Sequence, residues 1–260
     1  MQESTQQDNK LKESINMTPQ QVFEKQRYAL FNNVLSHETC KFLSNYMFLK
    51  RDAGYLEPPV ELGGSDNQCP RSWSIYGDPA FDTLLSQLAP SLSTMLGIDL
   101  LPAYTYARIY QPGEVLEWHV DRPSCEISGT MTIGKSDGAN WPIYVGTPGS
   151  TERVGKPIDI DTGELLMYSG CEVPHWRDEF DGEWQVQVFF HYVRKDGPYA
   201  KEHIRDGRAS LGILGSSDAH YKQVDRIVKY AVEGPPTPSV KPPTTKATNT
   251  SSLQPFKFEA

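Results

Sequence analysis

His119 and Asp121 have the residue types and the spacing of metal ligands. Residues i and i+2 of a β-strand point to the same side, so both side chains could reach one ion from a single strand end. Taken alone the pattern is weak, because a histidine of this kind is more often an ordinary surface or core side chain.

His175, in the segment CEVPHW, is a candidate for a third ligand. Several short β-rich runs separate it from Asp121, and two opposed strands of a double-sheet fold could bring the three side chains together. Two histidines and one carboxylate on one face of an octahedron leave three positions open. That set suits Fe(II) that must bind a co-substrate and O2.

The segment that must position these residues, about 101–195, has the pattern of a β-sheet domain. Short β-rich runs alternate with turn residues such as Pro112-Gly113 and Thr162-Gly163. Such spacing indicates an antiparallel sandwich or barrel. The predicted strands are YTYARIY, VLEWHVD, ISGTMTI, WPIYV, PIDI, ELLMY and WQVQVFFHYV.

Residues 36–97 are predicted to be largely helical. One helix should run from the N-cap Ser36 to about Lys50. A second should start near Pro79 and stop at Gly97, with a kink or a split at Pro90. A last helix is expected over 218–232. The apolar stripe of the first helix is predicted to contain Phe42, Leu43, Tyr46, Met47 and Leu49.

The ends of the chain differ in composition from the domain predicted over 21–232. Residues 1–20 have almost no apolar periodicity, and 233–260 are rich in Pro and Thr. Neither segment can bury enough surface to offset its ordering entropy, so both are predicted to be disordered tails.

The composition is that of an ordinary globular protein, with 38% hydrophobic residues and a net charge of −8. An acidic chain disfavours a nucleic-acid partner, because phosphate affinity comes mainly from Lys and Arg. No apolar stretch is long enough to span a membrane, and the polar N-terminus does not resemble a signal peptide. We therefore expect a cytoplasmic protein with four unpaired thiols, at Cys40, Cys69, Cys125 and Cys171.

The order of these segments resembles the iron(II)/2-oxoglutarate-dependent dioxygenases, in the branch that includes the prolyl 4-hydroxylases. The matching pieces are YARIYQPGEVLEWHVDR, DTGELLMYSG and CEVPHW followed by VQVFFHYV. The resemblance implies a mainly β fold, with a double-stranded β-helix (jelly-roll) core and flanking helices. It also implies Fe(II) held by His119, Asp121 and His175, with 2-oxoglutarate and O2 as co-substrates. The implied reaction hydroxylates a C–H bond of a peptide residue, proline among them, or of a small molecule, and releases succinate and CO2.

The sequence departs from that branch at the co-substrate anchor. Gln185 stands where relatives carry a cation that pairs with the far carboxylate of 2-oxoglutarate. A neutral amide cannot form a charge-assisted fork. The replacements that we consider are Lys135, Arg177 and Arg108, with support from the Tyr110 hydroxyl.

The substrate side is predicted from position alone. The segment NQCPRSWSIY, with Arg71 and Trp73, resembles by position the loop that covers the substrate in prolyl hydroxylases, although it could equally be an ordinary connection. Trp118, Arg122 and Trp176 flank the proposed ligands and are expected at the pocket mouth.

Two other functions stay open at this stage. The missing cation at Gln185 is compatible with a non-catalytic jelly-roll binding module. The metal-ligand pattern is also compatible with a cupin-type metalloenzyme that does not use 2-oxoglutarate.

Overall fold

The computed structural model describes residues 17–213, 227–229 and 232–233. Most of the two predicted tails and most of the predicted helix at 218–232 lie outside the described residues. The N-terminal boundary is corrected: helix α2 (Pro19–Gln26) already begins inside the predicted tail, with Thr18 and Gln21 forming a capping box.

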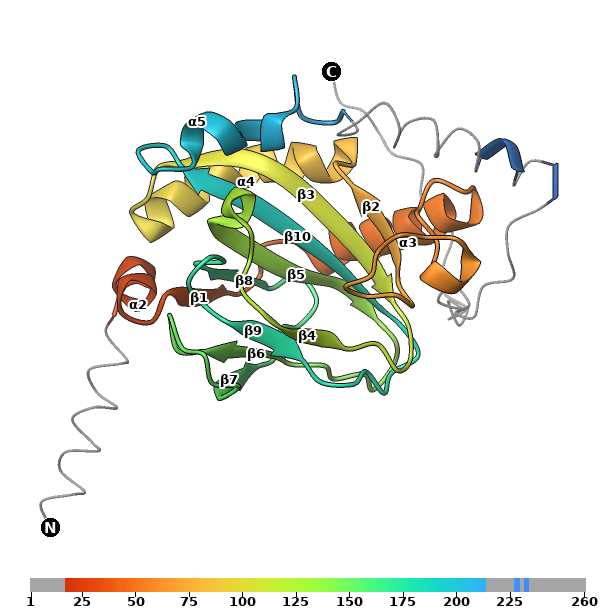
Figure 1. The fold of residues 1–260 in the computed structure, drawn as a ribbon, viewed down its shortest axis with the longest axis horizontal. Coiled ribbons are helices and arrows are strands. Elements are labelled where there is room, and N and C mark those ends of the chain that lie inside the picture. Colours follow the sequence, from red (N-terminus) through yellow and green to blue (C-terminus); the bar gives the residue numbers. More distant parts are fainter. Residues whose placement is uncertain (1–16, 214–226, 230–231, 234–260) are drawn as a thin grey trace, which may run out of the picture.

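Two antiparallel sheets face each other and form the jelly-roll core (Figure 1). The larger sheet has the strand order β1-β8-β5-β10-β3-β2, and the smaller has the order β4-β9-β6-β7. The larger sheet contains β1 (Tyr28–Phe31), β2 (Trp73–Tyr76), β3 (Leu100–Tyr110), β5 (Ile127–Lys135), β8 (Leu165–Tyr168) and β10 (Gln185–Arg194). The smaller contains β4 (Leu116–His119), β6 (Ile143–Gly146), β7 (Gly155–Ile158) and β9 (His175–Arg177). The predicted mainly β, jelly-roll class is confirmed.

The main helices α2, α3 (His37–Asp52) and α4 (Pro79–Leu96) cover the outer face of the larger sheet (Figure 1). As predicted, Ser36 caps α3, and α4 ends at Gly97, which adopts φ +66°. Asp78 caps α4 by accepting hydrogen bonds from the backbone N–H groups of Ala80 and Phe81. Shorter helices follow at Val60–Leu62, Pro123–Cys125, Ala200–His203 (α5) and Ile204–Gly207.

The structure contradicts one prediction about these helices and one of the two outcomes expected at Pro90. Phe42 and Leu49 are each 68% exposed, so the buried face of α3 is narrower than the predicted stripe. The helix α4 runs through Pro90 without a break. Pro90 lies on the exposed side of α4, away from the packed face.

Successive side chains of β10 point alternately into the apolar core and into the space between the two sheets. Val186, Val188 and Phe190 belong to the main core, which lies between the larger sheet and the helices. Phe189 and His191 instead line a cavity between the two sheets. Because successive side chains of a strand point to opposite faces, one strand both anchors the helices and walls the cavity.

Candidate metal centre and its pocket

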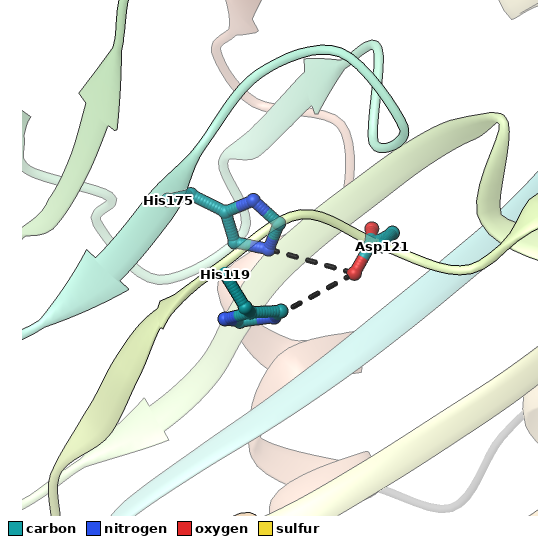
Figure 2. A group of neighbouring side chains, drawn as sticks. All are labelled: His119, Asp121 and His175. Carbon is teal, nitrogen blue, oxygen red and sulfur yellow. Dashed lines mark ion pairs between the residues drawn. The ribbon is translucent and has the colours of Figure 1, made fainter. Parts of the chain in front are cut away.

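His119, Asp121 and His175 meet where the two sheets face each other, and the carboxylate of Asp121 points at both imidazoles (Figure 2). The Oδ1 atom of Asp121 lies 3.7 Å from Nε2 of His119 and 3.6 Å from Nε2 of His175. Ligand atoms bonded to one ion at about 2.1 Å are separated by roughly 3–4 Å, so the three atoms fit around one metal.

The β-sheet register creates this arrangement. His119 at the end of β4 and His175 at the start of β9 are directly opposite each other in an antiparallel pair. Their ring centroids lie 4.3 Å apart. Asp121 follows two residues later, and its backbone N–H donates to the Gly170 carbonyl at 2.8 Å. This bond ties the residue to the loop that follows β8.

Both histidines present a lone pair to the site. Nδ1 of His119 lies 2.7 Å from the Glu117 carbonyl oxygen, and Nδ1 of His175 lies 3.0 Å from that of Val173. A carbonyl oxygen can only accept, so Nδ1 of each ring carries the proton and Nε2 is left as the acceptor. Burial also lowers the pKa of His175, which favours the neutral imidazole that metal binding requires.

Asp121 is held as a carboxylate. Burial alone would raise the pKa of Asp121, but His175, the contact with His119 and the Ser128 hydrogen bond together lower it below the usual range. The Ser128 hydroxyl donates to Oδ2 at 2.8 Å and lies 2.9 Å from Nδ1 of His191. With Oδ2 occupied in this way, Oδ1 is turned toward the two histidines.

The metal-ligand candidates open into a cavity of about 350 Å³. Leu116, Ile143 and Phe189 give it apolar walls. Its polar lining includes Arg108, Arg122, Gln68, Tyr104, Tyr106, Tyr168 and His191. Concave sites of this size that combine apolar walls with a few polar groups bind small ligands.

Three of the five basic residues that the sequence places near the site carry a carboxylate partner. Arg108 on β3 pairs with Asp66, Arg122 with Asp206, and Lys135 with Asp161. Lys135 is paired with Asp161 at the protein surface, which weighs against it as the anchor.

Arg177 on β9 is different. It is 1% exposed, and in the part of the chain that the structure describes no carboxylate lies within ion-pair distance of it. One Nη atom donates to the Trp141 carbonyl, and the other has no hydrogen-bond partner. Burial lowers the pKa of Arg177 to about 10, partly offset by Tyr110, Tyr168 and Cys69. Arg177 does not itself line the cavity, but it is two residues from His175 on the same strand and so points to the same side as that ligand candidate.

The two other predicted co-substrate residues are also buried inside the barrel. Gln185 donates to the side chain of Gln187 at 3.0 Å, in a polar row that continues to Thr130. The ring of Tyr110 is fully buried, and its hydroxyl lies 3.4 Å from Nη1 of Arg108.

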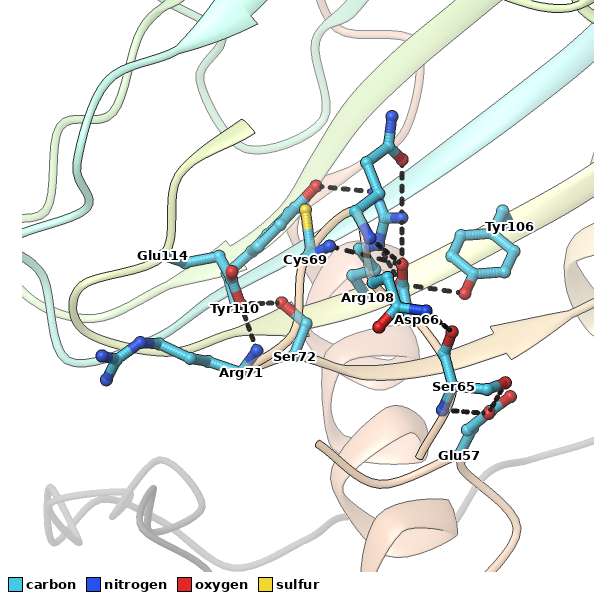
Figure 3. Close-up of polar contacts among 12 residues, drawn as sticks. Glu57, Ser65, Asp66, Cys69, Arg71, Ser72, Tyr106, Arg108, Tyr110 and Glu114 are labelled. Atoms are coloured by element: carbon cyan, nitrogen blue, oxygen red, sulfur yellow. Dashed lines mark hydrogen bonds and ion pairs between the residues drawn. The ribbon is translucent and has the colours of Figure 1, made fainter. Parts of the chain in front are cut away.

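The predicted substrate residues separate into two groups. Arg122 does line the cavity and stacks on the ring of Tyr104. Trp73 is a correction, since it is 1% exposed in the main core. Trp118, Trp176 and Arg71 are absent from the cavity lining as well. Trp176 stacks on Tyr144, and Arg71 is exposed and points away from Arg108 (Figure 3).

Several cavity residues were missed by the reasoning from sequence. Gln68 lines the cavity from the loop before β2, where Asp66 binds Arg108. From the larger sheet, Tyr168 lines it and Ser128 binds Asp121. The Tyr168 hydroxyl lies 3.5 Å from Nε2 of His175. The alternation of β5 and β8 could have suggested the last two, but nothing in the sequence distinguishes Asp66 from other loop carboxylates.

Comparison with solved structures shows the same architecture. A prolyl hydroxylase from Trichoplax adhaerens, in complex with a hypoxia inducible factor peptide, superposes with a TM-score of 0.50 at 18% identity, covering 74% of this chain and 94% of that one. EctD from S. alaskensis gives 0.53 at 14% identity, covering 76% and 89%. HygX from Streptomyces hygroscopicus, with nickel, 2-oxoglutarate and hygromycin B bound, gives 0.50 at 12% identity, covering 67% and 86%.

The chain has the jelly-roll fold of the iron- and 2-oxoglutarate-dependent oxygenases. The sequence matches no protein-family model and none of the curated proteins. None of the described helices in this oxygenase fold is long and apolar enough to cross a membrane.

Proposed function

We propose that this protein is an Fe(II)- and 2-oxoglutarate-dependent dioxygenase that hydroxylates a C–H bond of a small molecule or a peptide residue. The observation that carries the proposal is the convergence of His119, Asp121 and His175 inside an oxygenase fold, each with its metal-facing atom free of a proton. Charge supports it as well, because two neutral imidazoles and one carboxylate leave a bound divalent ion electrophilic.

These three side chains would hold the iron. When bound, the iron and 2-oxoglutarate would activate O2 for insertion into a C–H bond, with release of succinate and CO2. The protein would supply placement and a dry environment. The apolar side chains of Leu116, Ile143 and Phe189 exclude water from the cavity, and the Ser128 hydroxyl fixes the Asp121 carboxylate.

Arg177 is the residue that we assign to the far carboxylate of 2-oxoglutarate. A buried guanidinium without a counter-ion is costly, and an incoming carboxylate would remove that cost. The proposed position lies beside the candidate metal centre, because Arg177 and His175 point to the same side of β9. Arg108 is a weaker candidate for this role because Asp66 already neutralises it.

The test is anaerobic titration of the purified protein with Fe(II) and then with 2-oxoglutarate. A 2-oxo acid that chelates iron gives a visible metal-to-ligand charge-transfer band, which we expect in the wild type. We expect His119→Ala to abolish the band, while Lys135→Ala, a variant of a surface-paired cation, should keep it.

A wild-type protein that binds Fe(II) yet gives no band would overturn the use of 2-oxoglutarate and would favour another metalloenzyme of this fold. Failure to bind any divalent metal would favour a non-catalytic binding module. Where the band is present, release of succinate on addition of candidate substrates provides the screen for the finer specificity.

A further inference from the structure

The loop before β2 holds a carboxylate against Arg108, which lines the cavity. We call residues 63–72 the strap (Figure 3). Asp66 of the strap binds Arg108 with both oxygens, at 2.8 Å from Nε and 3.1 Å from Nη2. The Tyr106 hydroxyl donates to the same carboxylate at 3.0 Å. Asp66 also accepts the backbone N–H groups of Gln68 and Cys69, at 3.2 and 3.3 Å.

The surroundings of Arg108 are those of a carboxylate-recognition site. A guanidinium fork binds a carboxylate through two parallel hydrogen bonds, which fixes the orientation as well as the charge of the bound group. The guanidinium carbon lies 4.8 Å from the ring centroid of Tyr106 and 5.7 Å from that of Phe189. Both rings and Arg108 line the same cavity as His119.

A second strap side chain occupies the part of the cavity between Arg108 and the candidate metal centre. Gln68 accepts from Nη2 of Arg108 at 2.8 Å, and its own Nε2 lies 3.1 Å from Nε2 of His119. The strap therefore covers the recognition cation and the metal-facing atom of one ligand candidate at once. A substrate bound between Arg108 and the metal would have to take the place of these two side chains.

The middle of the strap is attached to Arg108 through Asp66, and its two ends are attached to Glu57 and Glu114. Glu57 accepts the backbone N–H of Ser65 at 2.7 Å, and Glu114 accepts the Ser72 hydroxyl at 2.7 Å. Displacement of Asp66 would therefore free the middle of the strap, which includes Cys69 and its fully buried thiol, while both ends stay held.

We propose that Arg108 binds the carboxylate of an organic-acid substrate, which displaces Asp66 and lifts the strap. This rests on the oxygenase function above and names its substrate class. Exchange of one carboxylate for another keeps the buried guanidinium paired throughout, whereas a neutral substrate would leave it without a partner. Arg177 and Arg108 then have separate roles, one toward the co-substrate and one toward the substrate.

The accessibility of Cys69 provides a test that needs neither iron nor 2-oxoglutarate. The wild type is treated with a small thiol reagent, and labelling is read for each cysteine by peptide mass spectrometry. The probes are monocarboxylates from propionate to 3-phenylpropionate, each at up to 50 mM and each paired with its primary amide. We expect at least one acid to accelerate Cys69 labelling about tenfold over its amide. The partly exposed Cys171 should label equally with both.

Three variants separate recognition from loosening of the strap. In the Asp66→Asn variant, Cys69 should label faster without any probe. The variant should also bind acids more tightly, because the Asp66 carboxylate no longer competes with them for Arg108. The double variant Asp66→Asn/Arg108→Met removes both charges and so avoids stranding a buried ion. It should lose the preference for acids over amides. Glu57→Gln loosens the strap outside the cavity and should keep that preference.

Equal effects of acids and amides, or no effect of any acid on the wild type and on Asp66→Asn, would overturn the proposal. Loss of the 2-oxoglutarate band in the double variant would also overturn it, because Arg108 would then serve the co-substrate. A normal band with no acid-dependent labelling rejects only the substrate class. Acid-dependent labelling without any band rejects the oxygenase and leaves an acid-binding site.

Discussion

Arg177 places a buried positive charge on the same strand as His175, and this charge limits the kind of group that can bind beside it. Its guanidinium lies inside the barrel without a carboxylate, whereas Arg108 and Arg122 have one each. Proteins do not bury an unpaired cation without a compensating anion or a functional reason. The dianionic co-substrate that we propose would provide that anion.

We therefore predict that Arg177→Met weakens 2-oxoglutarate binding about 100-fold, since truncation of one partner of a buried charged pair costs 2–5 kcal/mol. Arg177→Lys should recover part of the affinity. Anaerobic titration of the charge-transfer band measures it, with Lys135→Ala as the control. Unchanged affinity in Arg177→Met would remove Arg177 from the co-substrate site.

Ser128 acts through Asp121, by its hydrogen bond to Oδ2. We predict that Ser128→Ala lowers the affinity for Fe(II) about tenfold, because loss of a hydrogen bond that orients a metal ligand usually costs 10–100-fold. Competition with a chelator of known affinity measures it directly. Ser128→Thr keeps the hydroxyl and should stay close to the wild type, whereas equal losses in both variants would indicate a packing effect.

The reasoning from sequence proposed His119, Asp121 and His175 as a group, because strand periodicity links the first two and the family resemblance implies the third. Their binding of iron stays a prediction. The sequence could not rank Lys135, Arg108 and Arg177, since the ranking depends on ion pairs with Asp161 and Asp66 and on burial. Such pairings form between distant segments and leave no local pattern.

At the scale of elements, the loop after β8 decides how closely Asp121 can approach its neighbours. A Cβ atom at Gly170 would collide with the Cys125 carbonyl oxygen and with Oδ2 of Asp121. Gly170→Ala should therefore displace Asp121, lower iron affinity at least tenfold and cost roughly 2 kcal/mol of stability through overpacking.

Chelator competition and urea unfolding would measure the two effects of Gly170→Ala. Gly146→Ala on β6 is the matched control, because its Cβ would meet neighbours only at 3.3–3.5 Å. Wild-type iron affinity in Gly170→Ala would show that Asp121 is not held by this close approach.

Seven of the strands were predicted, and β1, β2 and β9 were not. The missed strands have only three or four residues, which is too short for an alternation to be recognised. They exist because a partner strand is already in place, as β8 is for β1 and β3 is for β2. In α3 the error concerned Phe42 and Leu49, which face solvent because the sheet covers only one side of the helix.

At the scale of the whole molecule, residues 200–208 close over one end of the barrel. Asp206 accepts hydrogen bonds from Arg122, Ser124 and Tyr76. Burial opposes ionisation of Asp206, but these hydrogen bonds and the Arg122 charge outweigh it and lower the pKa of Asp206 below the usual range.

A carboxyl group whose pKa is lower in the folded protein than in the unfolded chain stabilises the folded state when it is ionised. This stabilisation is complete at pH values well above the unfolded-state pKa of about 3.9. It is lost as the pH falls toward the pKa of the folded state. We predict that Asp206→Asn destabilises the protein by about 1 kcal/mol at pH 7, a value reduced for the half-exposed Arg122. The difference in unfolding free energy between Asp206→Asn and the wild type should shrink as the pH falls from about 4 to about 2. Urea unfolding at several pH values measures it.

Asp99→Asn breaks an exposed pair with Lys195 and should change little at any pH in the same measurement. A destabilisation by Asp206→Asn that is independent of pH would instead reflect lost packing of this segment.

The position of the two histidines also has a mechanical consequence. Among the described strands β4 pairs only with β9, through two partner positions separated by an irregularity, and one of those positions is the pair His119 and His175. An ion bound there would hold together this short pairing in the smaller sheet. Amide hydrogen exchange in β4 and β9 should slow when metal is added, while β3 and β10, joined along ten residue pairs, should change little. Release of the metal and transient opening of this sheet would then be one and the same event.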